Sequence, residues 1–166
     1  MEHDLFRKPV PTFRDHALVT DTRSYPSRPI LAVSAAIIRD GKVLIVRRAR
    51  EPANGLYTLP GGGVEAGETL FEAVMREVHE ETALEVEPVG LAGYREAIGR
   101  DGAGRIERHF VILPFAARWL SGEPVLSEEL SEAIWLDPAA IAGLETTAGL
   151  AEIIAAAMAL MAKAEA

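Results

Sequence analysis

Residues 62–84 read GGVEAGETLFEAVMREVHEETAL and carry the clearest pattern in the chain. The stretch opens with glycines and closes with a run of acids. Between them, Thr69 and Glu72 have the spacing of a capping box, in which each side chain accepts a hydrogen bond from the other residue's backbone N–H. A helix is therefore predicted from Thr69 to about Thr82. Apolar residues at helical spacing form its predicted buried stripe: Leu70, Ala73, Val74 and Val78.

Three carboxylates share one face of this predicted helix. Glu77 precedes Glu80 by three residues and Glu81 by four, so the side chains lie within about one turn. Like charges at this spacing repel and destabilise a helix. A solvated acidic face is the ordinary explanation for such a run. The adjacent glycines favour a second explanation, a site for Mg²⁺ with Mn²⁺ as the alternative, because these hard ions bind carboxylates, water and substrate phosphates.

Glu68 and Arg76 are expected to fix the glycine loop against the helix. Glu68 lies near the predicted helix start, where negative charge is favoured. Arg76 has the spacing to pair with Glu68 or with Glu72. The alternative is an ordinary surface ion pair, worth about 0–1 kcal/mol. The glycines before and within the loop allow the backbone to approach a ligand closely.

The segment resembles the Nudix box, Gly-x5-Glu-x7-Arg-Glu-U-x-Glu-Glu-x-Gly-U, where U is apolar. Every position matches except the final glycine, which is Ala83 here. The order of predicted elements over residues 30–136 is also similar to the family's. The resemblance implies an α/β fold, the Nudix α/β/α sandwich with a mixed sheet. Ala83 is expected either to accept left-handed strain of about 1 kcal/mol or to end the helix differently.

The resemblance also implies a reaction, hydrolysis of a nucleoside diphosphate linked to another moiety X. Divalent ions would bridge the acids to the diphosphate and lower the pKa of the attacking water. By this resemblance Glu77 and Glu81 are direct metal ligands, Glu80 lies close by as a candidate ligand of a second ion, and a backbone carbonyl at Gly61 or Gly62 adds a ligand. Glu68 and Arg76 have structural roles in the box.

The general base implied by the resemblance is either a box glutamate or a glutamate of a later loop. Among the box residues the candidates are Glu80 and Glu81. In the later segment we expect Glu129 or Glu132, just before a predicted strand at 134–136. A solvated acidic loop is the ordinary alternative for these two residues.

Several residues outside the acids are candidates for binding the substrate. Arg47 and Arg48 precede the box and are expected to contact phosphate or ribose. Tyr57 is a candidate for stacking on a base, and Gly62 for a close backbone approach. A surface role for the arginines and a core position for the tyrosine are the alternatives.

The loop over residues 48–60 resembles Nudix enzymes that act on ADP-ribose and nucleotide sugars, and also those that act on nucleoside triphosphates. We therefore expect a small nucleotide-containing diphosphate, ADP-ribose-like, as the substrate. A (d)NTP pyrophosphohydrolase and a non-catalytic nucleotide-sensing module are the alternatives. Because every box glutamate is present, the sequence favours the enzyme.

Composition narrows the remaining possibilities. The chain has 166 residues, about one domain, and 49% hydrophobic residues. The absence of cysteine excludes a disulfide framework, a thiolate metal site and a cysteine nucleophile. A net charge of −8 argues against nucleic acid or an anionic membrane as partner. With no signal-like segment and no apolar run of about 18 residues, a cytoplasmic location is expected.

The rest of the chain is predicted as follows. Residues 1–29 form an extended arm, and residues 30–166 form the Nudix domain. A strand at 30–38 and another at 43–46 are joined by a turn at Asp40-Gly41. The further expectations are a strand at 86–98 broken or bulged at Pro88 and Gly90, strand structure at 106–120 with Pro114 at an edge or bulge, a helix start at Asp137-Pro138, and a helix from about Thr147. The arm and the C-terminal helix are the candidates for a homodimer interface.

Overall fold

The structure is a computed structural model that describes residues 23–166; most of the predicted arm lies outside the described residues. The strands are β1 (Ile30–Arg39), β2 (Lys42–Arg48), β3 (Tyr57–Thr58), β4 (Gly61–Gly63), β5 (Glu85–Leu91), β6 (Arg95–Arg100), β7 (Ile106–Ser121) and β8 (Leu130–Leu136). The helices are α1 (Leu70–Thr82), the 3-10 helix η1 (Pro138–Gly143) and α2 (Leu150–Ala164).

The strands form one mixed sheet, as predicted. Its main order is β3-β2-β1-β7-β5, with β4 beside β1, β6 beside β7 and β8 beside β2. β1 runs parallel to β7 and antiparallel to β2 and β4. The β1–β2 turn lies at Asp40 and Gly41, both of which have positive φ, the backbone conformation that two-residue hairpins favour.

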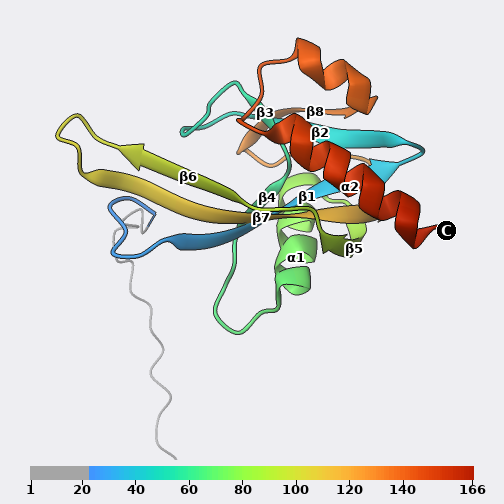
Figure 1. The fold of residues 1–166 in the computed structure, drawn as a ribbon, viewed down its shortest axis with the longest axis horizontal. Coiled ribbons are helices and arrows are strands. Elements are labelled where there is room, and N and C mark those ends of the chain that lie inside the picture. Colours follow the sequence, from blue (N-terminus) through green and yellow to red (C-terminus); the bar gives the residue numbers. More distant parts are fainter. Residues whose placement is uncertain (1–22) are drawn as a thin grey trace, which may run out of the picture.

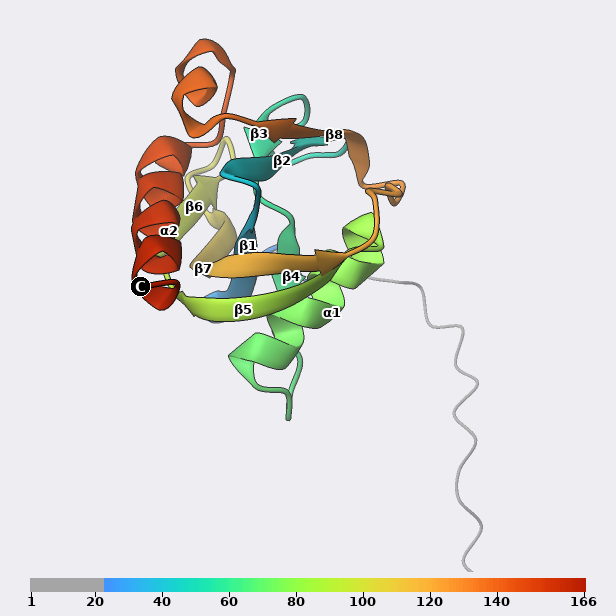
Figure 2. The ribbon, with the colours of Figure 1, turned by 90° about the vertical axis from the view of Figure 1, so that its right-hand side faces the viewer.

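Helices α1 and α2 lie on opposite faces of the sheet (Figures 1 and 2). Alternate residues of β1 point to the two faces, as the period of a strand requires. Val33, Ala35 and Ile37 join the core beneath α1, whereas Ala36 and Ile38 join the core beneath α2. The α/β sandwich expected from the resemblance is therefore the observed fold. None of the helices in residues 23–166 is long and apolar enough to span a membrane.

The irregularity predicted at Pro88 and Gly90 is confirmed, because the register with β7 shifts there, but the continuous strand predicted to 98 is wrong. Two strands, β5 and β6, pair in succession with the long strand β7. The chain leaves the ladder at residues 92–94, where the Ala92 N–H donates to the Pro114 carbonyl. Pro114 has neighbours on both sides, so it is not at an edge. Pro114 lies at the point where the partner of β7 changes from β6 to β5. Residues 92–94 lie opposite only residues 113 and 114 of β7, so the partner chain has one extra residue here, as in the expected bulge.

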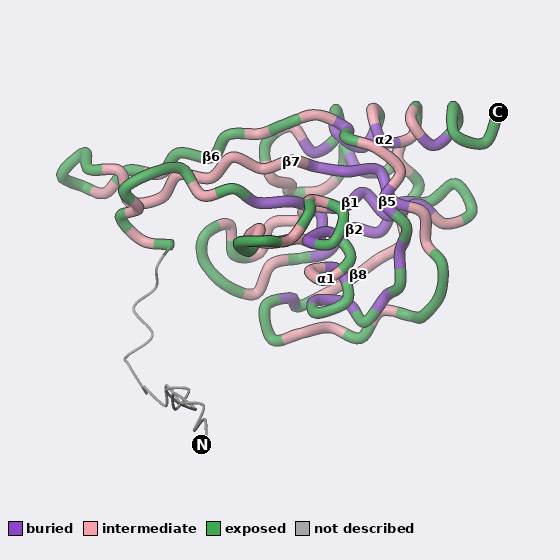
Figure 3. The backbone as a smooth tube through the Cα atoms, turned by 90° about the horizontal axis from the view of Figure 1, so that it is seen from below, coloured by how far each residue is buried: buried purple, intermediate pink, exposed green. Residues whose placement is uncertain are grey.

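The β6–β7 hairpin projects beyond the body of the molecule (Figure 1). Buried residues are concentrated in the body, whereas the hairpin tip is exposed or intermediate (Figure 3). The Tyr25 N–H donates to the Glu107 carbonyl on β7 at 2.8 Å. The described end of the predicted arm therefore packs along this hairpin.

The C-terminal helices differ in detail from the prediction. The Asp137 side chain accepts from the Ala139 N–H at 2.9 Å, but the helix it caps is the short 3-10 helix η1. The last helix begins at Leu150, after Gly149 with a positive φ.

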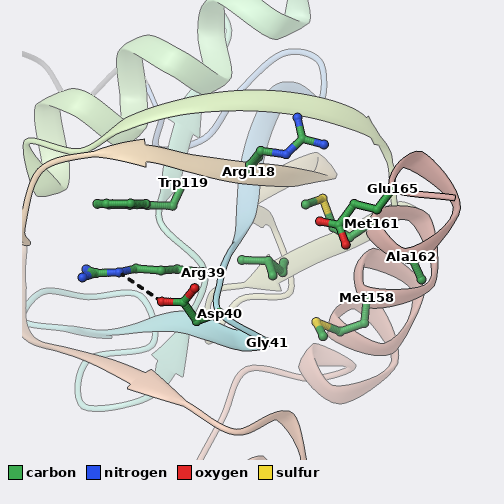
Figure 4. Close-up of a pocket in the computed structure, with 10 residues that line it drawn as sticks. Arg39, Asp40, Gly41, Arg118, Trp119, Met158, Met161, Ala162 and Glu165 are labelled. Atoms are coloured by element: carbon green, nitrogen blue, oxygen red, sulfur yellow. Dashed lines mark ion pairs between the residues drawn. The ribbon is translucent and has the colours of Figure 1, made fainter.

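Near the C-terminal end of α2, one arginine lies between two tryptophans. The Arg39 guanidinium is 4.3 Å from the Trp119 ring centroid and 5.5 Å from that of Trp135. Its Nη1 pairs with Glu123 at 2.7 Å. A pocket of about 410 Å³ opens beside this stack and is bounded on the helix side by Met158 (Figure 4).

Candidate active site

The glutamate-bearing helix begins as predicted. Thr69 is its N-cap and accepts from the Glu72 N–H at 3.2 Å, while the Glu72 carboxylate accepts from the Thr69 N–H at 2.7 Å. These bonds lower the pKa of Glu72. Ala73, Val74 and Val78 are buried against the sheet, so the acids of the last turns lie at the margin of the helix, beside the glycine loop.

Arg76 joins the loop to the helix, and its partner is Glu68 rather than Glu72. Two of its nitrogens donate to the Glu68 carboxylate at 3.0 and 2.6 Å, and Nη2 also donates to the Gly63 carbonyl at 2.9 Å. These hydrogen bonds, together with one from the Glu65 backbone, lower the pKa of Glu68 to about 2. Nη1 donates to Glu77 at 2.8 Å. One guanidinium therefore holds two carboxylates and the loop backbone.

Glu77 lies directly against the glycine loop. A Cβ placed on Gly62 would collide with the Glu77 carboxylate, so the contact requires glycine at this position. Pairing of β4 with β1, Gly62 opposite Val33, holds the loop in place. Burial raises the pKa of Glu77, while Arg76 opposes that shift.

Glu81 is the most deeply buried acid of the site, with 6% of its surface exposed. Its Oε2 accepts from the Gly61 N–H at 2.8 Å. Burial raises the pKa of Glu81 to about 7, helped by the charges of Glu77 and Glu129 and opposed by the Gly61 N–H and Arg48. A buried carboxyl beside other carboxylates is unfavourable when charged, which is typical of functional sites.

The third box acid, Glu80, is 59% exposed and reaches Arg76 only at 3.5 Å. The helix ends at Ala83, which has φ 57° and ψ 16° and donates to the His79 carbonyl at 2.8 Å. Of the two expectations for Ala83, the strained left-handed cap is confirmed. The cap does not disturb the acids.

Two of the remaining candidates lie near Glu81. The loop before β8 is bound to the end of α1, since the Ser127 N–H donates to the Glu81 carbonyl at 3.0 Å. This bond brings Glu129 close enough to affect the pKa of Glu81. Arg48, at the end of β2, acts on the same carboxyl with the opposite sign.

The other three candidates form a separate group on the α2 face of the sheet. The Tyr57 hydroxyl donates to Glu132 Oε2 at 2.6 Å, which raises the pKa of Tyr57. The Arg47 guanidinium lies 5.8 Å from the Tyr57 ring centroid, and Tyr57 packs on the core beneath α2. Arg47 and Arg48 are consecutive strand residues and so point to opposite faces. Sequence analysis did not separate these two groups, although the alternation of β2 contained the signal.

The predicted metal ligands are present, but their carboxylates do not converge on one point. Within residues 23–166 no three His, Asp or Glu side chains come close enough together to hold a metal ion. The Glu77 carboxylate is turned toward Arg76, and Glu81 toward the Gly61 N–H. The donor chemistry nevertheless fits a hard divalent cation, because carboxylate oxygens of the half-buried Glu77 and the buried Glu81, both with raised pKa values, lie beside a glycine loop.

The fold is a mixed sheet between two helices, and the acidic helix α1 follows the glycine strand β4. This arrangement is typical of one known class of domain. A sequence model of the NUDIX domain matches residues 28–157. The chain belongs to the Nudix family.

Three similar proteins illustrate the relationship. The ADP-ribose pyrophosphatase of Methanocaldococcus jannaschii is 37% identical over 109 residues, which are 66% of this chain and 62% of that protein. The chain thus spans less than two thirds of that relative. The MutT-like protein of Streptomyces ambofaciens is 36% identical over 115 residues, 68% of each protein. The crystal structure of a MutT NUDIX hydrolase from Burkholderia pseudomallei has a TM-score of 0.66 at 28% identity, covering 78% of this chain and 98% of that one.

Proposed function

We propose that the protein is a metal-dependent pyrophosphohydrolase that cleaves a nucleoside diphosphate linked to another moiety X. The observation that carries this proposal is the placement of the half-buried Glu77 and the buried Glu81 against the loop at Gly61 and Gly62. Burying two carboxylates is costly unless a cation compensates. Arg76 is already bonded to Glu68, so a further positive charge is needed.

Glu77 and Glu81 would hold Mg²⁺ or Mn²⁺, with Glu80 nearby and the Gly61 carbonyl as a further donor. The bound ion would neutralise the diphosphate and acidify the attacking water. Arg76 keeps Glu77 at the loop and fixes the loop through Gly63. If Glu77 held the ion instead of pairing with Arg76, Arg76 would still bind Glu68 and the Gly63 carbonyl, so the loop would keep its anchor.

The proposed general base is Glu129 rather than Glu132. Glu129 acts electrostatically on Glu81 and lies on an exposed loop, free to accept a proton from water. Glu132 instead accepts a hydrogen bond from Tyr57 on the α2 face. Arg48 lies on the same side as Glu81 and is assigned to the phosphates, whereas Arg47 and Tyr57 are assigned to the nucleoside end.

We further propose an ADP-ribose-like substrate, supported by the similarity to the M. jannaschii ADP-ribose pyrophosphatase. The similarity to MutT-like proteins over most of both chains favours (d)NTPs as the second candidate. The net charge of −8 agrees with a small anionic substrate brought in with cations rather than with nucleic acid.

The test is a hydrolysis screen with product identification. ADP-ribose, nucleotide sugars and dNTPs are incubated with Mg²⁺, Mn²⁺ or EDTA, and the products are separated chromatographically. Cleavage of ADP-ribose gives AMP and ribose phosphate, whereas cleavage of a dNTP at the same type of bond gives dNMP and pyrophosphate. We expect turnover that EDTA abolishes. Binding of a nucleotide without turnover would instead support a sensing module, and turnover unaffected by EDTA would contradict the metal assignment.

A further inference from the structure

Strand β6 presents an edge that no other strand of residues 23–166 covers. It pairs with β7 along one side only, and the hairpin carries it away from the body (Figure 1). The unpaired N–H and C=O groups of such an edge are a template for another strand. Ile98, in the middle of β6, is 54% exposed.

Other edges of the sheet carry features that discourage pairing. β3 and β4 have two and three residues, β5 contains Pro88 and two register shifts, and β8, which pairs with β2 only, has a register shift opposite Arg47 and Arg48. Short edges, proline and bulges all disfavour pairing of edge strands. β6 has no proline and keeps its register with β7 from Arg95 to Gly99, and its one register shift falls at the end of the strand, between Gly99 and Arg100. This edge is therefore suited to receive a strand.

The sequence of β6, REAIGR, is complementary to itself in one antiparallel register. When two copies meet with Ile98 opposite Ile98, Glu96 of each copy lies opposite Arg100 of the other. Opposite charges in such positions stabilise a strand pair. A register displaced by one residue on one strand would place Arg95 opposite Arg100, and like charges there are unfavourable. Charge therefore favours the register centred on Ile98 over this displaced one.

The two charged residues are available for this pairing. Glu96 and Arg100 are both exposed, and neither forms an ion pair within residues 23–166. Arg100 donates only a hydrogen bond to the Gly104 carbonyl in the hairpin turn, at 3.0 Å. A two-fold pairing would give each molecule two new ion pairs without breaking one.

We propose that the protein forms a two-fold dimer in which β6 pairs antiparallel with β6 of a second copy, joining the two sheets. A contact through a six-residue edge is smaller than a standard protein interface, so the dimer is weak and concentration-dependent. This interface is distinct from the arm and the C-terminal helix considered from sequence, and it is independent of the proposed reaction.

The test is sedimentation velocity of the full chain over micromolar to near-millimolar concentrations, with four charge variants. Wild type is expected to shift from monomer to dimer. Glu96→Arg and Arg100→Glu each place like charges opposite one another, and each is expected to raise the dissociation constant by about tenfold or more. The double variant Glu96→Arg/Arg100→Glu restores opposite charges and is expected to restore the dimer. Glu165→Arg, at the end of α2, is the matched control and leaves the dimer unchanged.

The thermal unfolding midpoint of each variant establishes that it folds. The proposal is overturned if wild type stays monomeric throughout, if the single charge reversals leave the dimer intact, or if the double variant dissociates as readily as either single one. Loss of the dimer in Glu165→Arg would place the interface at α2 instead. Slower hydrogen exchange of the Ala97 to Gly99 amides at high protein concentration is the expected second readout.

Discussion

Helices α1 and α2 cover opposite faces of one sheet, yet they bury different chemistry. α1 buries a carboxylate, Glu81, among its apolar residues. α2 buries only apolar side chains, Leu150, Ile153, Ile154, Ala157 and Met161. The exposed acid of α2, Glu152, lies at its solvent side. A helix that buries charge is less stable than its sequence allows, and such costs are characteristic of functional sites.

The ends of the two helices also differ, in the backbone strain that they carry. α1 has a full capping box at its start but ends on a left-handed alanine, Ala83. α2 starts after Gly149, the residue type that adopts a positive φ without strain. We therefore expect substitutions in α1 to change mainly the activity and substitutions in α2 to change mainly the free energy of unfolding.

The largest expected effect is on catalysis by α1. Glu81→Gln keeps the shape and the acceptor for the Gly61 N–H but removes the charge, and we expect activity to fall by about 10³-fold. Glu152→Gln is the matched change on α2 and should leave kcat/KM unchanged. Steady-state hydrolysis of the best substrate measures both. Equal activity of the two variants would remove Glu81 from the mechanism.

The next effect is on stability through α2. Ile154 is 1% exposed, and Ile154→Ala should lower the free energy of unfolding by about 4 kcal/mol by leaving a cavity. The exposed Glu152→Ala should change it by less than about 0.5 kcal/mol. Urea unfolding gives both values. Because α2 holds none of the glutamates of the candidate site, kcat of folded Ile154→Ala should match wild type, and a parallel loss of kcat would contradict the separation.

The third expected effect is a pH dependence of stability, caused by Glu81 on α1. The pKa of Glu81 is about 7 in the folded protein and 4.5 when unperturbed, so the folded state holds its proton more tightly. Stability is therefore lost as pH rises from 4.5 to 7, by about 3 kcal/mol in total. In EDTA, wild type should lose this stability between pH 4.5 and pH 7, whereas Glu81→Gln should not. Parallel pH profiles of the two proteins would disprove the raised pKa.

The smallest expected effect is on stability, and it comes from replacing alanine by glycine at two positions. Ala83→Gly relieves the left-handed cap and should stabilise the protein by about 1 kcal/mol. Ala155→Gly, at an exposed position inside α2, should destabilise it by about the same amount. Thermal unfolding should therefore shift in opposite directions. Destabilisation by both would mean that Ala83 carries no strain.

Local sequence predicted the features that depend on near neighbours. The capping box of Thr69 and Glu72 and the turn at Asp40-Gly41 occur as expected, and the left-handed cap at Ala83 is one of the two alternatives that the sequence left open. Each depends on a few consecutive residues and on steric rules that hold in any fold.

Features set by distant strands were not predictable in the same way. Pro88 and Gly90 suggested where the strand at 86–98 would break, but the chain leaves the sheet at 92–94 because β7 is long enough for two partners. The separation of Glu129 from Glu132 depends on how β8 pairs with β2, including the register shift between Arg47 and Arg48. Neither pairing is encoded within one segment.

Both tryptophans of the chain, Trp119 and Trp135, flank the same guanidinium of Arg39. Their intrinsic fluorescence consequently reports on a single location, around Arg39 at the end of β1, to which β7 contributes Trp119 and β8 contributes Trp135. In unfolding experiments this emission follows the opening of that location, while circular dichroism follows the helices. Coincidence of the two signals would then be a direct measure of how cooperatively the sheet and its two covering helices come apart.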